Sequence, residues 1–179
     1  PTGARIEIFC LQPVKPEEYN LSFAATESCT WKCVIGNAKK WKGDILSLYN
    51  PQEDAAVTAL NMRAELVSRE GETGIVCFSW DGGHPFSRVL EICGTIPIPP
   101  YLNRESEALD VERYQTLYAK IRGSVAAPTA GLHFTEKVLE EIKARGIDME
   151  TVCLHVGAGT FLPVKDSEVS KHSMHREPF

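Results

Sequence analysis

The fold is decided around residues 96–101, which read Ile96-Pro97-Ile98-Pro99-Pro100-Tyr101. The prolines in this stretch remove backbone donors and fix φ, so it cannot form a helix interior. Before it, apolar residues recur with the period of a strand, and after it helix and strand signals alternate. We therefore predict an extended linker here, with a domain boundary between residues 95 and 96.

Residues 1–95 are predicted to form a small β-barrel domain. Strand candidates with alternating apolar positions occur at residues 5–9, 31–35, 45–49, 56–67 and 75–80. Gly and Pro turn signals separate them, as is typical of a small barrel or sandwich. A helix is expected between Pro85 and Gly94, because its apolar residues, Phe86, Val89, Leu90 and Cys93, fall on one face.

Residues 96–179 are predicted to form part of an α/β catalytic domain. One helix is expected over residues 110–120, with an inward face of Val111, Tyr114, Leu117 and Tyr118. A second is expected over residues 136–145, between Thr135 as N-cap and Gly146 as C-cap. Strands at residues 124–127 and 151–156 would complete a parallel β–α–β unit with a right-handed crossover. The predicted fold class is therefore α+β, in two domains.

Composition narrows the function classes. The chain has 179 residues, 43% hydrophobic and 24% charged, which excludes a disordered tail, a collagen-like repeat and a simple coiled coil. No apolar stretch approaches the roughly 18 residues of a membrane span, and no export signal is visible. The six cysteines are therefore expected as free thiols in a reducing cytoplasm. The net charge of −5 means that a nucleic-acid partner would need a local basic patch.

Two loops are expected to leave the carboxyl ends of the predicted parallel strands, where ligands bind in such sheets. They read Pro128-Thr129-Ala130-Gly131-Leu132-His133-Phe134 and Gly157-Ala158-Gly159-Thr160-Phe161. His133 in the first and His155 just before the second could exchange protons near neutral pH. The alternative is equally open: the glycines make tight turns, and His155 is a hydrogen-bonded core residue. With Leu162 in place of a third glycine, the second loop also lacks the full dinucleotide fingerprint.

Two basic segments are candidates for RNA contacts. An Arg beside Tyr and Gln, as in Arg113-Tyr114-Gln115-Thr116, can bind phosphate and stack on bases, or Arg113 is solvated and Tyr114 is in the core. Three lysines around a Trp, as in Lys39-Lys40-Trp41-Lys42, can grip an RNA backbone and stack a base. For so short a run of charge, a solvated turn is the favoured interpretation.

The end of the chain carries His172-Ser173-Met174-His175-Arg176-Glu177. Its histidines lack the i, i+4 spacing of a helical metal pair, and no general-base Glu lies between them. We predict no metal site, and expect a polar wall of the same cleft or an exposed terminal segment.

Together these motifs resemble one family. The motifs follow one another along the chain at residues 96–101, 113–116, 125–134, 155–161 and 172–177. That order resembles the S-adenosylmethionine:tRNA ribosyltransferase-isomerase family of queuosine biosynthesis. The first half is similar to the inserted β-barrel domain of that family, more loosely, through Arg5-Ile6-Glu7 and Ala38-Lys39-Lys40. Since family members are considerably longer, we expect this chain to be a fragment truncated at both ends.

The resemblance implies a transferase with an unusual reaction. The ribosyl part of S-adenosylmethionine moves to an aminomethyl-deazaguanine wobble base of tRNA and is isomerised, giving epoxyqueuosine-tRNA with release of adenine and methionine. The implied partners are that tRNA and S-adenosylmethionine as co-substrate, with no further cofactor and no membrane. We expect a cytoplasmic monomer, and weak or absent turnover by the fragment alone.

Site residues follow from the resemblance as hypotheses. His133 and His155 are the candidates for proton transfer, with His175 and Glu177 as second candidates. The residues expected to shape the pocket are Thr129, Gly131, Gly157, Gly159 and Thr160. Phe134 or Phe161 would contact the sulfonium or the adenine face. The remaining substrate-binding candidates are Arg113, Tyr114, Gln115, Lys39 and Lys40.

Two other functions compete with the transferase. The first is a non-catalytic tRNA-binding module built on the barrel, which would bind tRNA without any effect of S-adenosylmethionine. The second is a nucleotide or sugar-phosphate enzyme that uses the two glycine loops, which predicts competition by anions at the cleft.

Overall fold

A computed structural model describes residues 3–71, 73–96, 98, 102, 104, 106–107, 109–120, 127–154, 156, 168 and 170. Its contacts divide the chain into two compact units, Pro1–Thr95 and Ile96–Phe179. They are termed the first and the second unit, and each is described by itself. Independent folding of the two units as domains stays a prediction, as does the extended linker, most of which lies outside the described residues.

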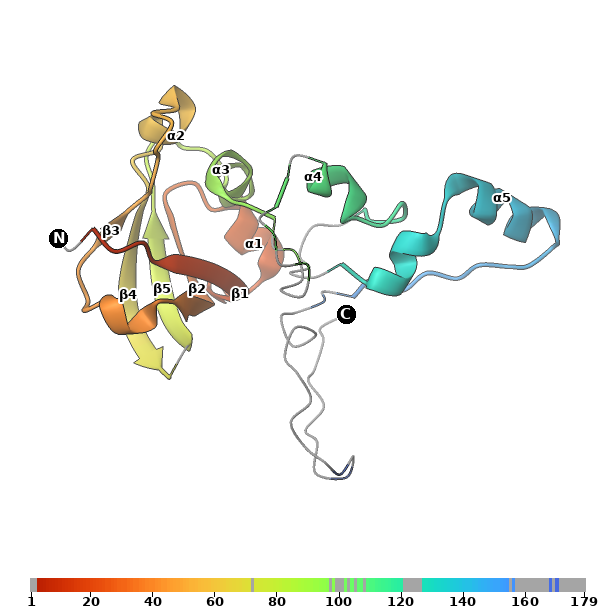
Figure 1. Cartoon of the computed structure of the whole chain (residues 1–179), viewed down its shortest axis with the longest axis horizontal. Helices are drawn as coiled ribbons and strands as arrows, with labels where there is room; N and C mark the ends of the chain where they lie inside the picture. The colour runs from red at the N-terminus through yellow and green to blue at the C-terminus, as the bar shows by residue number, and fades with distance from the viewer. Residues whose placement is uncertain are drawn as a thin grey trace. The chain divides into compact units, whose positions relative to one another are not determined.

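The first unit is built on one antiparallel sheet (Figure 1). Its strands are β1 (Glu7–Lys15), β2 (Ser28–Gly36), β3 (Leu46–Ser47), β4 (Arg63–Glu70) and β5 (Thr73–Ser79). Across the sheet they follow the order β1-β2-β5-β4-β3. The strands predicted at residues 5–9, 31–35, 45–49 and 75–80 are thus confirmed, with shifted ends.

One face of the sheet is buried. Along β2, Trp31, Cys33 and Ile35 are at most 3% exposed, whereas Val34 between them is 36% exposed. The β5 partner of Trp31 is Val76, which is fully buried as well. Burial on every second residue is the pattern of a sheet with one face on the core and one in water.

Two helices cover the buried face. They are α1 (Tyr19–Ala24) and α3 (Phe86–Cys93), which contact each other. The ring centroid of Phe86, on α3, lies 5.7 Å from that of Trp31, 5.6 Å from Phe78 and 5.3 Å from Trp80. Stacked aromatic rings at these distances supply most of the buried area of a small core. The helix predicted between Pro85 and Gly94 is therefore confirmed.

The predicted barrel is wrong, because the sheet is open. Among the described residues β1 pairs with β2 and β3 with β4, and no pairing joins β1 to β3. Closure requires the two edge strands to pair in a consistent register, and β3 offers only two residues. The chain before β1 and the chain after β3 still meet, since the Arg5 guanidinium lies 5.7 Å from the centre of the Tyr49 ring.

The strand predicted over residues 56–67 is wrong in its first half. A short helix, α2 (Ala55–Ala59), lies there instead. The Asp54 carboxylate accepts from the amides of Ala56 at 2.7 Å and Val57 at 3.3 Å. Such an N-cap satisfies the free amides of a first helical turn and outweighs the alternation. Further along this segment Leu60 and Ala64 do lie in the core, since they are 1% and 7% exposed.

The second unit contains shorter elements. They are α4 (Asp110–Arg113), the 3-10 helix η3 (Thr129–His133) and α5 (Glu136–Ala144). The helix predicted over residues 110–120 is therefore wrong beyond α4, which ends at Tyr114 with φ −94° and ψ 41°. Val111 and Leu117, predicted to face inward, are 65% and 53% exposed. The residues after α4 pack on the η3 turn instead of continuing the helix.

The second predicted helix of this unit is confirmed as α5. The Thr135 hydroxyl accepts from the Val138 amide at 3.3 Å, which caps the first turn. At the other end Gly146 has φ +70°, and its amide donates to the Lys143 carbonyl at 3.0 Å. The Ile147 amide donates to the Ile142 carbonyl at 3.2 Å, which completes a Schellman ending. None of the described helices is long and apolar enough to span a membrane.

The predicted parallel β–α–β unit is not formed by the residues that the structure describes. Residues 151–154 lie in no strand, and Val152 and Leu154 are 74% and 45% exposed. Residues 124–126 of the other predicted strand lie outside the described part of the chain. Alternation becomes a strand only where a neighbouring strand takes up its backbone hydrogen bonds, and the pattern alone does not supply that neighbour.

Candidate functional site

The first predicted loop folds as a tight turn that exposes a histidine. Over η3 the Gly131 amide donates to the Pro128 carbonyl at 2.8 Å, and the Phe134 amide donates to the Gly131 carbonyl at 3.2 Å. These bonds bury Gly131 and leave the side chain of His133 in solvent. The turn thus holds an imidazole in an accessible position beside an aromatic ring, that of Phe134.

A second motif packs directly against this turn. A Cβ atom at Gly131 would lie only 2.1 Å from the Tyr118 hydroxyl oxygen and 2.8 Å from Cγ2 of Thr116. Only a residue without a side chain allows so close an approach. The Tyr118 ring also meets the Phe134 ring edge-on, with centroids 6.4 Å apart and an interplanar angle of 77°. The segment after α4 and the η3 turn therefore form one cluster.

A partly buried ion pair fixes the start of α4. Arg104 donates from Nη1 and Nη2 to the Asp110 carboxylate at 2.6 and 2.7 Å, and the Glu107 amide donates to it at 2.8 Å. The Asp110 residue is 7% exposed. The Arg104 hydrogen bonds, and then the Glu107 amide, lower the pKa of the Asp110 carboxyl to about 2. The carboxylate thus stays charged and holds the segment that leads to Thr116 and Tyr118.

The substrate-binding candidates of this unit lie around the cluster. Thr129, Arg113 and Gln115 are exposed, Phe134 is 37% exposed, and Tyr114 is half-buried. The side-chain Oε1 of Gln115 accepts from the backbone amide of Thr116 at 3.1 Å, so the side-chain oxygen already has a local partner. The structure therefore brings the predicted motifs at residues 113–116 and 128–134 together.

The other half of the predicted cleft lies outside the described residues. This applies to the second loop and the terminal motif, namely His155, Gly157, Gly159, Thr160, Phe161, His175 and Glu177. The convergence of the two loops therefore stays a prediction. Within the described ranges no group of His, Cys, Asp or Glu could hold a metal ion.

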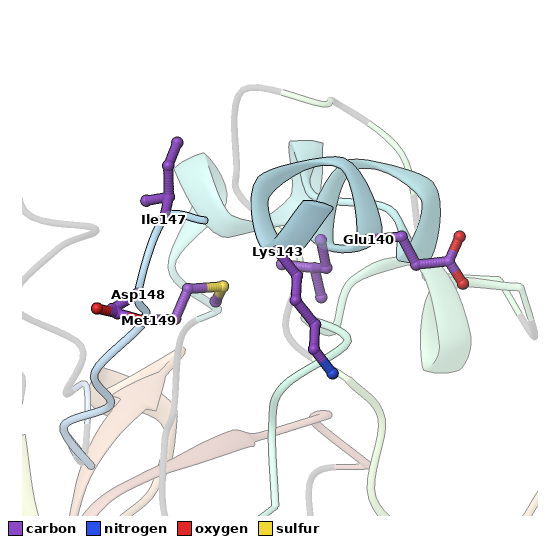
Figure 2. Close-up of a pocket in the computed structure, with 6 residues that line it drawn as sticks. Glu140, Lys143, Ile147, Asp148 and Met149 are labelled. Atoms are coloured by element: carbon purple, nitrogen blue, oxygen red, sulfur yellow. The ribbon is translucent and has the colours of Figure 1, made fainter. Parts of the chain in front are cut away.

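A pocket of about 420 Å³ lies elsewhere in this unit, between α5 and the chain that follows it (Figure 2). Its lining residues are Leu139, Glu140, Lys143, Ile147, Asp148 and Met149. Figure 2 shows Glu140 pointing to the side away from Ile147, Asp148 and Met149. The pocket follows from the Schellman ending, which turns the chain back along the helix. None of the predicted site residues lines it.

The basic segment of the first unit is divided between core and solvent. Lys39, Lys40 and Lys42 are exposed, whereas Trp41 is 3% exposed and donates from Nε1 to the Asp44 carbonyl at 2.7 Å. The less favoured alternative, in which Trp41 stacks on a base, does not fit, because its ring is part of the core. The lysines remain available to a polyanion.

Sequence reasoning missed two groups of this site. Asp110 was expected only as the first residue of a helix, and Tyr118 only as part of a buried helical face. The signal for Tyr118 was Gly131 itself, since a glycine inside a turn often marks a close approach. Nothing in the local pattern pairs Arg104 with Asp110.

Comparisons with known proteins now identify the family. A family model described as queuosine biosynthesis protein matches residues 1–179. A protein from Trichlorobacter lovleyi is 42% identical over 99% of this chain and 46% of its own length. One from Citrifermentans bemidjiense is 39% identical over 98% of this chain and again 46% of its own length. Both are named S-adenosylmethionine:tRNA ribosyltransferase-isomerase.

A third relative, from Legionella pneumophila, bears the same name and is 59% identical over 51% of this chain and 27% of its own length. The chain thus spans about half the length, or less, of these curated relatives. No solved structure matches it.

Proposed function

This chain belongs to the queuosine biosynthesis protein family, and on that premise we propose that it takes part in S-adenosylmethionine:tRNA ribosyltransferase-isomerase activity. The ribosyl moiety of S-adenosylmethionine would pass to the aminomethyl-deazaguanine base of tRNA. Its isomerisation gives epoxyqueuosine-tRNA, and adenine and methionine leave. The observation that carries the proposal is the family match over the whole chain, together with 42% identity to a relative of that name.

The exposed imidazole on the η3 turn supports a role in proton transfer. A sulfonium acidifies the protons on the neighbouring ribose carbon, so a modest base suffices to remove one. Imidazole changes charge near neutral pH and is the commonest side chain in such a role. We assign this step to His133, with His155 as its proposed counterpart and His175 and Glu177 as second candidates.

The cluster around Gly131 supports a binding role for the same turn. Its close packing on Tyr118 fixes the backbone near Thr129, and Phe134 offers a partly exposed ring. An aromatic face attracts a sulfonium through its quadrupole and stacks on adenine. The proposed pocket also includes Gly157, Gly159, Thr160 and Phe161 of the second loop.

The proposed partners follow from the same reaction. They are S-adenosylmethionine as co-substrate and a tRNA with the queuosine-precursor wobble base, and we propose that no further cofactor is needed. Arg113, Tyr114, Gln115 and the lysines at positions 39 and 40 are proposed to contact the tRNA. We place this chemistry in the cytoplasm, where both substrates occur, and propose a monomer.

A chimera tests the function. In the Trichlorobacter lovleyi relative, the segment that matches this chain is replaced by residues 1–179, and the product is incubated with S-adenosylmethionine and substrate tRNA. We expect adenine release and the epoxyqueuosine mass among the digested nucleosides. The chain alone is measured in parallel, with weak or absent turnover expected. A folded chimera that binds tRNA but releases no adenine would favour the non-catalytic tRNA-binding module instead.

His133 is tested in the same chimera. His133→Ala is expected to lower adenine release by about a hundredfold or more, since loss of a general base costs this much. His84→Ala is the matched control, because His84 is an exposed histidine of the first unit that no proposed step uses. Equal rates for the two variants would remove His133 from the mechanism.

A further inference from the structure

One end of the first unit's sheet gathers basic side chains from three separate segments. The exposed cations there are Arg5 before β1, Lys39, Lys40 and Lys42 after β2, and Arg69 near the end of β4. Two hydrogen bonds tie these segments together. The Asn37 side-chain amide donates to the Arg5 carbonyl at 3.1 Å, and Arg69 Nη2 donates to the Trp41 carbonyl at 3.0 Å. This set of five cations is termed the basic end.

The concentration of charge at the basic end runs against the composition of the unit. Residues 1–95 contain nine Lys and Arg against twelve Asp and Glu, yet five of the nine cations belong to the basic end. Residues 37–42 hold three lysines and no carboxylate. The carboxylates nearest in sequence to the five cations are those of Glu7, Asp44, Glu70 and Glu72. A local positive field within an acidic unit attracts a polyanion without binding anions everywhere.

An exposed aromatic ring lies beside one of these cations, Arg5. Tyr49 is 67% exposed, and the guanidinium of Arg5 lies 5.7 Å from its ring centre. Trp41, in contrast, is held in the core with its Nε1 bonded to the Asp44 carbonyl. Tyr49 rather than Trp41 therefore offers a face on which a base can stack. Cations that track phosphates and an aromatic ring that stacks a base are the two components of a single-stranded RNA site.

We propose that the basic end binds the phosphate backbone of RNA, with Tyr49 as the stacking face for one unpaired base. The inference rests on the proposed function and names the surface of the first unit that holds the tRNA. A membrane surface is the competing polyanion. It would be held by large apolar side chains, of which Ile45 is 61% exposed three residues after Lys42, whereas the ring beside Arg5 is a tyrosine that the guanidinium stacks on.

The test measures RNA binding by the 179-residue chain without S-adenosylmethionine. Fluorescence anisotropy of a labelled tRNA anticodon stem–loop is recorded over a series of salt concentrations. The basic-end variant is Lys39→Ala, Lys40→Ala and Lys42→Ala combined. The matched control removes the same charge from exposed cations outside the basic end, as Lys15→Ala, Arg63→Ala and Arg88→Ala combined.

The basic-end variant should bind more than tenfold more weakly at about 0.1 M salt. Its slope of log affinity against log salt should fall by about three, since each phosphate-binding lysine contributes about one. The control should change affinity less than about threefold, because it alters net charge alone. Tyr49→Ala should weaken binding by about tenfold, and Tyr49→Phe should retain it, since stacking needs the ring and not the hydroxyl.

Three outcomes would overturn the proposal that the basic end binds RNA. They are equal losses in the two triple variants, absence of RNA binding by the unaltered chain, and preferential binding to vesicles of anionic phospholipid over the stem–loop. None of these depends on catalysis. RNA binding at the basic end with an inactive chimera would refute the proposed function alone. If the chimera is active but the basic-end variant of the 179-residue chain still binds RNA normally, the proposed RNA-binding surface alone is refuted.

Discussion

Gly131 is the residue through which two motifs of the second unit meet. Because its φ is outside the left-handed range, the cost of a side chain there is purely steric. Gly131→Ala would drive a methyl group to 2.1 Å from the Tyr118 hydroxyl oxygen. We expect a loss of about 2 kcal/mol from the contact between the two segments, typical of overpacking. Hydrogen exchange of the amides at residues 117–119 and 130–134 should accelerate accordingly.

A double variant isolates this contact. Tyr118→Ala removes two of the three atoms nearest to the added methyl group, since the third belongs to Thr116. Combined with Gly131→Ala, it should therefore cost less than the sum of the single changes. Strictly additive effects on exchange would show that Tyr118 and Gly131 do not touch.

The cysteines should differ sharply in reactivity. Burial raises the pKa of the Cys29 thiol to about 12 and that of Cys93 to about 11. The pKa of Cys33 is raised by its hydrogen bond with Cys10 and then by burial. Cys153 is exposed. Since the thiolate is the nucleophile, alkylation by iodoacetamide at pH 8 should label Cys153 first, the half-buried Cys93 slowly, and the buried Cys29 and Cys33 only on unfolding. Mass mapping that found Cys29 labelled as fast as Cys153 would contradict this burial.

At this scale the sequence predicted the turn that holds His133 but not the burial of Trp41. His133 was expected in an exposed turn, and it lies there. Stacking by Trp41 was considered because it stands among lysines, but the core residues that bury it come from elsewhere in the chain. A local charge run fixes the exposure of lysines and not the direction of the aromatic residue between them.

The short helix α4 depends on a carboxylate whose charge the fold favours. The folded pKa of Asp110, about 2, lies below the ordinary value of about 4. Its contribution to stability is therefore fully present above about pH 4 and is lost as the pH falls through about 2. Asp110→Asn should remove this part of the acid dependence. Amide exchange of residues 110–114, followed between pH 5 and pH 2 with rates corrected for intrinsic exchange, measures it.

Glu112→Gln is the matched control, since it removes a carboxylate from the exposed side of the same helix. It should leave the pH profile of α4 close to that of the unaltered chain. Superimposable profiles for Asp110→Asn and the unaltered chain would mean that the Arg104 ion pair contributes nothing to folding.

The ends of α5 are set by two residues. Thr135→Ala removes the hydroxyl that caps the Val138 amide, and it should cost about 1 kcal/mol of helix stability. Thr135→Ser keeps the acceptor and should cost much less. Gly146→Ala places a Cβ on a residue with φ +70° and should cost about 1 kcal/mol. Exchange protection of residues 138–145 reports all three, and equal protection in Thr135→Ala and Thr135→Ser would refute the cap.

The caps of α5 could be predicted from the sequence, whereas the end of α4 and the pairing of strands could not. Thr135 and Gly146 bound α5 as expected, because caps act within a few residues of the helix. Asp54 carries the same kind of cap signal for α2, but the prediction for residues 56–67 followed their apparent alternation instead. The predicted strand over residues 151–156 failed for a different reason: a strand exists only through a partner that local sequence does not identify.

The division of the molecule into two units has a spectroscopic test. All three tryptophans of the chain, Trp31, Trp41 and Trp80, lie in the first unit and are at most 4% exposed. Residues 1–95 expressed alone should therefore keep the blue-shifted emission and the urea midpoint of the full 179-residue chain. Asp110→Asn should leave that midpoint unchanged, because it lies in the other unit. A red-shifted emission from residues 1–95 would show that the core needs the second unit.

The edges of the open sheet have a consequence for the behaviour of the protein at high concentration. β1 carries Pro13, which has no amide hydrogen, and its register with β2 shifts at two points. β3, at the opposite edge, is two residues long. An incoming strand from another molecule therefore meets no long, straight row of donors and acceptors, and growth into fibrils by edge-to-edge addition is disfavoured.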